Sequence, residues 1–130
     1  MSMFKNVNVV SYDVADWERA KKFYSEVLDW PVAWASDEFG WIEYGRENEA
    51  HIAINRWQPH EGHTTRPPVQ GGATVVLTVD DARQVTEALR KKGVKCDDVV
   101  TIPGVVTYGT FYDPEGNRIQ FAEAAPPPQA

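Results

Sequence analysis

Hydrophobic and polar positions alternate along this chain in an order that repeats after about 65 residues. In each half an alternating run precedes an apolar stripe with three- and four-residue steps, and two more apolar runs follow it. The strand-like runs lie at 7–14, 41–44, 51–55, 74–79, 105–112 and 118–121. Alternation with a period of two predicts strands, and the longer steps predict helices. Each half is therefore predicted to be a strand, a helix and a strand hairpin, and the halves to be modules that share one site.

Both predicted helices begin at an aspartate, whose carboxylate can accept hydrogen bonds from the first backbone amides of a helix. Asp16 is the candidate cap of the first helix, and Asp80 or Asp81 that of the second. The apolar stripes that follow consist of Trp17, Ala20, Phe23, Tyr24, Val27 and Leu28 in the first helix and of Val85, Ala88 and Leu89 in the second. Gly93 is expected to end the second helix. Such stripes normally pack into a core.

The composition is that of one folded domain. Of the 130 residues, 42% are hydrophobic and 25% charged, which is ordinary for a single soluble core. We predict one domain over residues 1–130, with proline and glycine marking its connections. Module one spans about 4–56, a linker about 57–72, module two about 73–124, and a mobile tail 125–130.

The charge and the cysteine content exclude several classes of protein. A net charge of −6 argues against nucleic-acid binding, which needs a basic surface, and suits a neutral or cationic small ligand. Cys96 is the only cysteine, so an intramolecular disulfide is impossible. No apolar run approaches the ~20 residues of a membrane helix, and the first residues do not form a signal peptide. We therefore predict a cytoplasmic protein without nucleic-acid or membrane partners.

Two segments carry a family resemblance. The helix phrase at 16–30 and the Tyr-Asp-Pro-Glu-Gly-Asn-Arg-Ile-Gln-Phe phrase at 112–121 resemble the vicinal oxygen chelate superfamily of glyoxalases, bleomycin resistance proteins and extradiol dioxygenases. The resemblance covers essentially the whole chain. It implies an α+β fold of two βαβββ modules whose mixed sheet forms a cup, and a homodimer in which both subunits complete each site.

In metal-using members such as glyoxalase I, four strand positions supply the ligands. By the resemblance these correspond to Val9, Ala53, Thr74 and Gln120. Divalent metals bind carboxylates, imidazoles or thiolates, which these residues do not offer. We therefore expect no metal at the usual site and no cofactor. An atypical metal site at His60 and His63 stays open, beside the reading of both as solvated loop histidines.

If those four positions face the cup, strand alternation defines the residues inside it. The candidate ligand-binding residues are Val9, Ser11, Trp41, His51, Asn55, Thr74, Tyr108 and Gln120. The hairpin register around Glu43 and Tyr108 stays open. A register with Glu43 on the cup side places it opposite His51, where the two form either a proton-transfer pair or a cross-strand ion pair.

Three functions remain after these observations. The leading one is a metal-independent protein of the glyoxalase and bleomycin-resistance type that binds a small aromatic or cationic molecule in a cup at a dimer interface. The second is a lyase or isomerase that uses His51 and Glu43 for proton transfer. The third is a structural or association subunit. The residues alone do not decide whether the chain is an enzyme.

Overall fold

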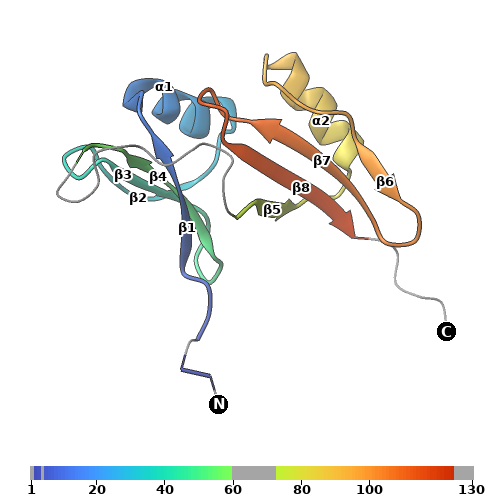
Figure 1. Ribbon diagram of the computed structural model, residues 1–130, viewed down its shortest axis with the longest axis horizontal. Helices are drawn as coiled ribbons and strands as arrows, with labels where there is room; N and C mark the ends of the chain where they lie inside the picture. Colours follow the sequence, from blue (N-terminus) through green and yellow to red (C-terminus); the bar gives the residue numbers. More distant parts are fainter. Residues whose placement is uncertain (1, 4, 60–72, 125–130) are drawn as a thin grey trace. The chain divides into compact units, whose positions relative to one another are not determined.

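The computed structural model describes residues 2–3, 5–59 and 73–124 of the chain. The chain divides into two compact units, Met1–Pro68 and Val69–Ala130. Each unit contains its own four-stranded mixed sheet and one helical segment (Figure 1). Most of the predicted linker, the histidines His60 and His63 within it, and the predicted tail at 125–130 lie outside the described residues.

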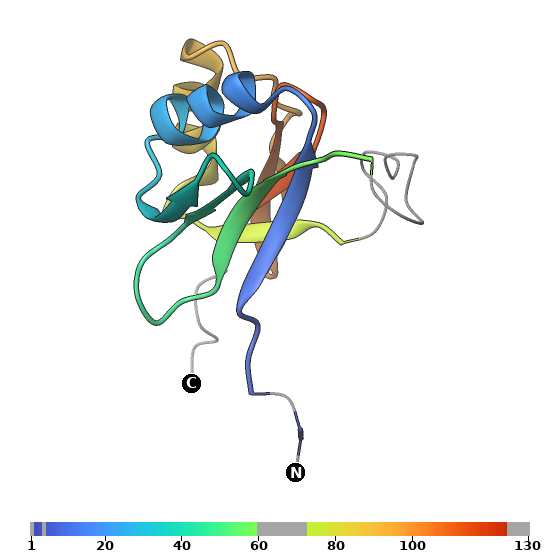
Figure 2. The same cartoon turned by 90° about the vertical axis from the view of Figure 1, so that its left-hand side faces the viewer.

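The first unit has the order strand, helix and three strands. Its elements are β1 (Val9–Val14), α1 (Trp17–Lys21), the π-helical turn η1 (Lys22–Val27), β2 (Val32–Ser36), β3 (Trp41–Tyr44) and β4 (His51–Arg56). The sheet order is β1-β4-β3-β2, and β1 runs parallel to β4 beside it (Figure 2). The carboxylate of Asp16 accepts a hydrogen bond from the Arg19 amide at 3.2 Å, so the predicted first cap is confirmed.

An aromatic cluster joins α1 and η1 to the buried face of this sheet. Tyr44 is fully buried, and its ring stacks on Tyr24 at 5.8 Å and on Trp30 at 6.2 Å between centroids. Its hydroxyl lies 2.8 Å from the hydroxyl of Ser25. Ile42, Ile52 and Ile54 are buried with it. These residues therefore form the core of the first unit.

The second unit repeats this order. Its elements are β5 (Val75–Thr78), α2 (Ala82–Lys91), β6 (Val100–Ile102), β7 (Val106–Tyr112) and β8 (Arg118–Ala124), with the sheet order β5-β8-β7-β6. Of the two candidate caps, Asp81 is the one used, and it accepts hydrogen bonds from the amides of Arg83 and Gln84 at 3.1 Å. Gly93 follows the helix with φ at +81°, the conformation that makes glycine a helix stop.

The predicted α+β class with two βαβββ modules is confirmed, but the sequence pattern missed the second strand of each unit, β2 and β6. In β2 four of five residues are exposed, and in β6 all three are. Alternation is readable only where one face of a strand is buried, so exposed edge strands leave no such pattern. The family resemblance, not the pattern, implied these two strands.

Two smaller expectations were wrong. The first strand begins at Val9, because Val7 lies outside the sheet and is exposed. On α2, Ala88 is exposed and Thr86 is buried in the stripe instead. The Thr86 hydroxyl donates to the carbonyl of Ala82 at 2.9 Å, which removes the cost of burying it.

Gly109 on β7 allows the sheet and α2 to pack closely, which gives a first prediction. A Cβ at this position would lie 2.4 Å from Cζ and 2.5 Å from Cε2 of Phe121. We expect Gly109→Ala to lower the free energy of unfolding by about 1–3 kcal/mol through overpacking. Urea denaturation measures this loss. Combining it with Phe121→Leu should cost less than the sum of the two single changes, and simple additivity would contradict the proposed clash.

Candidate functional site

The face of the first sheet opposite the aromatic cluster carries most of the candidate residues. We call it the polar face of the first sheet. The pairing register brings Trp34, Glu43, Ala53 and Ser11 into one row across β2, β3, β4 and β1. A second row contains Ser36, Trp41, Asn55 and Asp13, and His51 lies beside Val9. The register left open by the sequence is therefore settled for Glu43.

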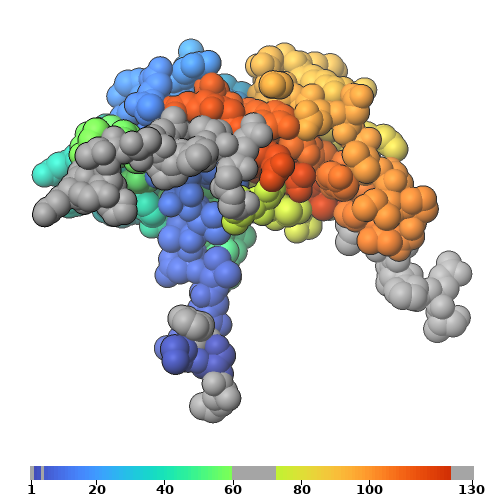
Figure 3. Space-filling view, viewed as in Figure 1, coloured from blue at the N-terminus to red at the C-terminus, as the bar shows by residue number. Residues whose placement is uncertain are grey.

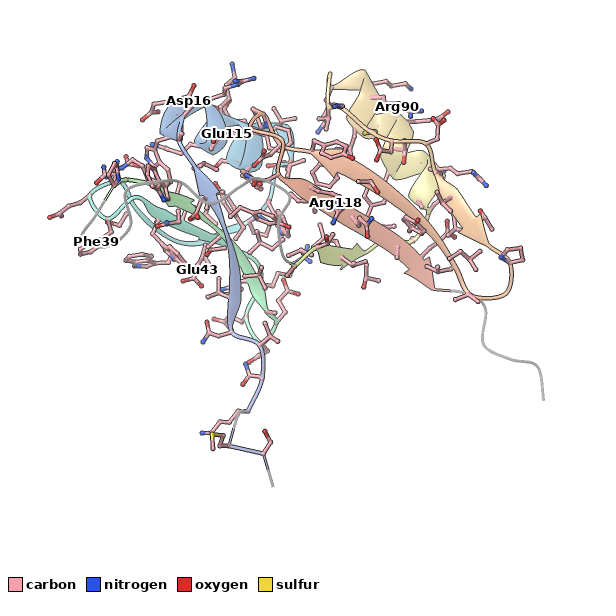
Figure 4. The ribbon with its side chains drawn as sticks, in the orientation of Figure 1. Asp16, Phe39, Glu43, Arg90, Glu115 and Arg118 are labelled. Carbon is pink, nitrogen blue, oxygen red and sulfur yellow. The ribbon has the colours of Figure 1, made fainter. Side chains whose placement is uncertain are left out.

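Trp41, Glu43 and His51 form a hydrogen-bonded trio on this face. Nδ1 of His51 lies 2.8 Å from Oε1 of Glu43, and Nε1 of Trp41 donates to Oε2 of Glu43 at 3.0 Å. The side chains of His51 and Glu43 are 21% and 23% exposed. Figure 4 shows Glu43 on its strand. The predicted contact between Glu43 and His51 is confirmed, and each carboxylate oxygen has a different partner.

The surroundings of His51 favour its doubly protonated form. Its second nitrogen, Nε2, lies 3.0 Å from the carbonyl oxygen of Arg46, which can only accept a hydrogen bond. Because Glu43 also accepts, both ring nitrogens donate only when the ring is an imidazolium. The hydrogen bond to Glu43, and then that to Arg46, raises the pKa of His51 above its ordinary 6.5. The hydrogen bonds from His51 and Trp41 lower the pKa of Glu43.

A shallow depression of about 340 Å³ borders this trio. Its lining consists of Asn6, Asn8, Glu43, Glu47, Asn48, Glu49 and His51. The lining offers three carboxylates and three amides, and His51 is its one cationic group. Such a surface suits ligand groups that carry positive charge or donate hydrogen bonds.

The other predicted residues of the first unit surround the trio without bonding to it. Asn55 donates to Oδ1 of Asp13 at 3.0 Å instead. Ser11 is exposed, Val9 is half-buried beside His51, and Ala53 is fully buried.

Trp34 belongs to the same row as Glu43, and the sequence reasoning did not count it as a ligand contact. It is 50% exposed, and its ring stacks on that of Phe39, which is 72% exposed, at 6.5 Å and 23°. The signal for Trp34 was absent because its strand shows no alternation. An exposed aromatic side chain next to a carboxylate is a typical contact for a cationic ligand.

In the second unit, the remaining candidates share one face of the sheet, which we call the polar face of the second sheet. Gln120 lies between Val76 and Thr110 in the register and donates to the Thr110 hydroxyl at 3.3 Å. Tyr108 lies opposite Ala122 on the same face, which settles its register. Thr74 accepts a hydrogen bond from Nη2 of Arg118 at 2.6 Å. The sequence reasoning missed Arg118, although it precedes Gln120 by two residues and alternation places both on one face.

The four positions that hold metal in some relatives do not fit a divalent ion here. Val9 and Ala53 carry no donor atom, and Thr74 and Gln120 provide only neutral oxygens. In residues 2–3, 5–59 and 73–124, no group of three or more His, Cys, Asp or Glu side chains is arranged to hold a metal ion. The alternative pair His60 and His63 lies outside these residues.

The trio predicts a pH dependence of stability. His51 has a raised pKa, so its contribution is complete below 6.5 and is lost as pH rises through its pKa in the folded state. Glu43 has a lowered pKa, so its contribution is complete above 4.5 and is lost as pH falls through its folded pKa. The pair should therefore stabilise most between pH 4.5 and 6.5.

Urea denaturation of the wild type and Glu43→Gln tests this dependence. We expect the stability difference between the two proteins to be larger at about pH 5.5 than at about pH 9, because the ring loses its charge as pH rises through the raised pKa of His51. An equal difference at both pH values would contradict the charged pair.

Comparison with known proteins identifies the family. The sequence profile of the Glyoxalase/Bleomycin resistance protein/Dioxygenase superfamily matches residues 6–121, and the chain belongs to this family. A glyoxylase-like domain-containing protein of Didymella fabae is 29% identical over 121 residues, which cover 90% of this chain and 92% of that protein.

Solved structures share the fold. TnmS3, an antibiotic binding protein from Streptomyces sp. CB03234, has a TM-score of 0.76 at 24% identity, with 96% of this chain and all of that chain covered. A glyoxalase/bleomycin resistance protein from the same Streptomyces has a TM-score of 0.68 at 25% identity, over 89% of this chain and 98% of that chain. In the described part of our chain, no helix is long and apolar enough to span a bilayer.

Proposed function

We propose that this protein binds a small aromatic cation without the help of a metal, on the polar face of its first sheet. Glu43 supplies the negative charge, and Trp41 and Trp34 supply aromatic surface. The observation that carries the proposal is the pair of hydrogen bonds that fixes the Glu43 carboxylate between Trp41 and His51. A carboxylate held in this way loses little conformational entropy when a ligand binds.

The neighbouring aromatic rings suit the same ligand. Trp34 is opposite Glu43 across β2 and β3, and the indole of Trp41 is bonded to the same carboxylate. A cation over an indole ring gains about 0.5–2 kcal/mol, and more when water is excluded. The structurally similar TnmS3 is an antibiotic binding protein, which supports binding as the function of this fold here as well.

The geometry favours binding over proton transfer by His51 and Glu43. A general base needs a lone pair directed at its substrate, and both nitrogens of His51 are directed at acceptors within the protein. A lyase or isomerase that uses this pair is the second candidate function. For such a reaction, the imidazole of His51 first has to lose a proton and one of its two hydrogen-bond partners. If the protein were only a structural subunit, the exposed ring of Trp34 would have no ligand to contact.

We also propose that the protein is a homodimer. The edge strands β2 and β6 expose Val32 in one unit and Val100 and Ile102 in the other. β6 lies at the surface of the second unit (Figure 3). An exposed apolar edge strand is a template for pairing with another chain, and exposed apolar patches mark interaction sites. Sedimentation should give a dimer at micromolar concentration, and a monomer alone would contradict the proposal.

A ligand screen by tryptophan fluorescence tests the proposed function. We expect aromatic cations such as benzyltrimethylammonium to change the emission, and matched aromatic carboxylates to have no effect. Elemental analysis of the purified protein should find no stoichiometric divalent metal. Selective binding of the carboxylates, or one equivalent of metal at Val9, Ala53, Thr74 and Gln120, would overturn the proposal.

A further inference from the structure

The loop between β3 and β4 is fastened at both of its ends by backbone hydrogen bonds. At its start, the amide of Gly45 donates to the carbonyl of Pro31 at 2.9 Å. At its end, the amide of His51 donates to the carbonyl of Asn8 at 3.0 Å. Directly after its first anchor the 45–50 loop is also held by a side chain, through the hydrogen bond between Nε2 of His51 and the carbonyl of Arg46 at 3.0 Å.

The loop is shaped to fit against the imidazole. Gly45 has φ at +140°, and a Cβ there would lie 2.6 Å from Cδ2 of His51, so a side chain would displace the ring. Asn48 also has a positive φ, at +64°. The carboxylate of Glu49 accepts from the amide of Arg46 at 2.6 Å, which closes the turn on itself. The loop therefore forms a compact turn, and the ring of His51 packs against its first residues, Gly45 and Arg46.

We propose that His51 is a proton-operated latch, which holds the 45–50 loop against the depression beside Glu43 when it is charged and releases the loop when it is neutral. In the imidazolium, Nδ1–H donates to Glu43 and Nε2–H donates to the Arg46 carbonyl. When one proton leaves to solvent, the other stays on Nδ1, because a carboxylate is the stronger acceptor. Nε2 then directs a lone pair at a carbonyl oxygen 3.0 Å away, and this contact is no longer attractive.

The charged groups around the ring set the pH at which the latch acts. Glu43 faces the ring from β3, Glu49 acts on it from the loop, Glu47 lines the same depression, and Arg46 contacts the ring through its backbone carbonyl. From β1 the residue opposite is Val9, which is uncharged. The hydrogen bonds to Glu43 and to the Arg46 carbonyl, together with the charges of Glu43 and Glu49, raise the pKa of His51, so the latch should remain closed above the ordinary pKa of histidine.

Release of the loop should change access to the ligand site, a consequence that rests on the proposed function. Glu47, Asn48 and Glu49 from the loop line the same depression as Glu43 and His51. When His51 is neutral, the depression has lost its one cationic lining group. The 45–50 loop, which forms part of the wall of the depression, is then no longer held by the ring. A cationic ligand should therefore bind more tightly as pH rises through the pKa of His51.

Nuclear magnetic resonance on the whole chain tests the latch without any ligand. We expect the amide signals of Arg46, Glu47, Asn48 and Glu49 to titrate with the same midpoint as the His51 ring, and the neutral ring to keep its proton on Nδ1. Protection of these amides from hydrogen exchange should fall about fivefold to tenfold, the effect of losing one net hydrogen bond. Loop signals that do not change while the ring titrates, or a neutral ring protonated on Nε2, would overturn the latch.

Two variants and a probe sharpen the result. Glu43→Gln should lower the shared midpoint, whereas the control variant Cys96→Ser, which changes a side chain of the second unit, should leave it unchanged. Benzyltrimethylammonium has a charge that does not titrate, so any pH dependence of its binding comes from the protein. Tighter binding above the midpoint supports the latch as a control of access, and equal affinity on both sides overturns that role. Failure to bind at any pH contradicts the proposed function and leaves the loop titration as a separate test of the latch.

Discussion

Replacing Tyr44 by alanine should lower the free energy of unfolding by about 3–5 kcal/mol, the cost of removing a fully buried aromatic side chain. The ring of Tyr44 stacks on Tyr24 and Trp30, so the change removes contacts between β3 and the helical segment as well as apolar volume. Domains are typically stable by only about 5–15 kcal/mol, so this loss is a large part of the total. Urea denaturation monitored by circular dichroism measures it.

Tyr44→Phe is the matched control, because it keeps the ring and removes only the hydroxyl that contacts Ser25. We expect it to cost about 1 kcal/mol, the net value of one hydrogen bond. If the alanine variant were no less stable than the phenylalanine variant, the aromatic cluster would not be the core of the first unit.

Loss of the fixed carboxylate or of its indole partner should weaken the binding of an aromatic cation. We expect Glu43→Gln and Trp41→Ala each to raise the dissociation constant for benzyltrimethylammonium about fivefold to thirtyfold, because each removes a charge or cation–π contact of roughly 1–2 kcal/mol. Isothermal titration calorimetry measures the change.

Cys96→Ser serves as the control for this experiment. The thiol lies in the second unit, and its hydrogen bond to the carbonyl of Val94 is one that serine can replace. The affinity of the Cys96→Ser variant for benzyltrimethylammonium should equal that of the wild type. Wild-type affinity in both Glu43→Gln and Trp41→Ala would remove the polar face of the first sheet from the binding site.

Much of the fold could be predicted because it depends on local chemistry. Asp16 and Asp81 cap helices through their own side chains, and Gly93 ends a helix through its own φ. The turn between β7 and β8 is equally local, since one oxygen of Asp113 accepts from the amides of Glu115 and Asn117. Each of these signals lies within a few residues of the structure that it specifies.

The candidate site could be predicted only in part, because pairing register depends on strands distant in sequence. Alternation placed His51 and Gln120 on their faces, but which side of β3 carries Glu43 follows from the pairing of β3 with β4. Trp34 and Arg118 are absent from the predicted ligand contacts for different reasons. Trp34 lies on an exposed strand without alternation, and Arg118 lies in the hairpin phrase that was interpreted for its turn and for Gln120.

A comparison of equivalent positions in the two modules shows where the chemistry of the two sheets differs. Thr74 corresponds to Val9, and the two registers then make Arg118 the counterpart of His51 and Thr110 that of Glu43. Both modules thus place a basic side chain at the same position of the sheet. In the first module a carboxylate accompanies it, whereas the second has a hydroxyl there. Only the first sheet therefore offers a fixed negative charge at this position.

A crystal structure of the protein soaked with benzyltrimethylammonium tests the central claim most directly. We expect the ammonium group beside the Glu43 carboxylate and the phenyl ring against Trp41 or Trp34. A contrasting surface is the depression of about 460 Å³ along α1 and η1, lined by Glu18, Lys21, Lys22, Ser25 and Glu26. Density for the ligand on the polar face of the first sheet would support the account, and density only at the α1 surface would contradict it.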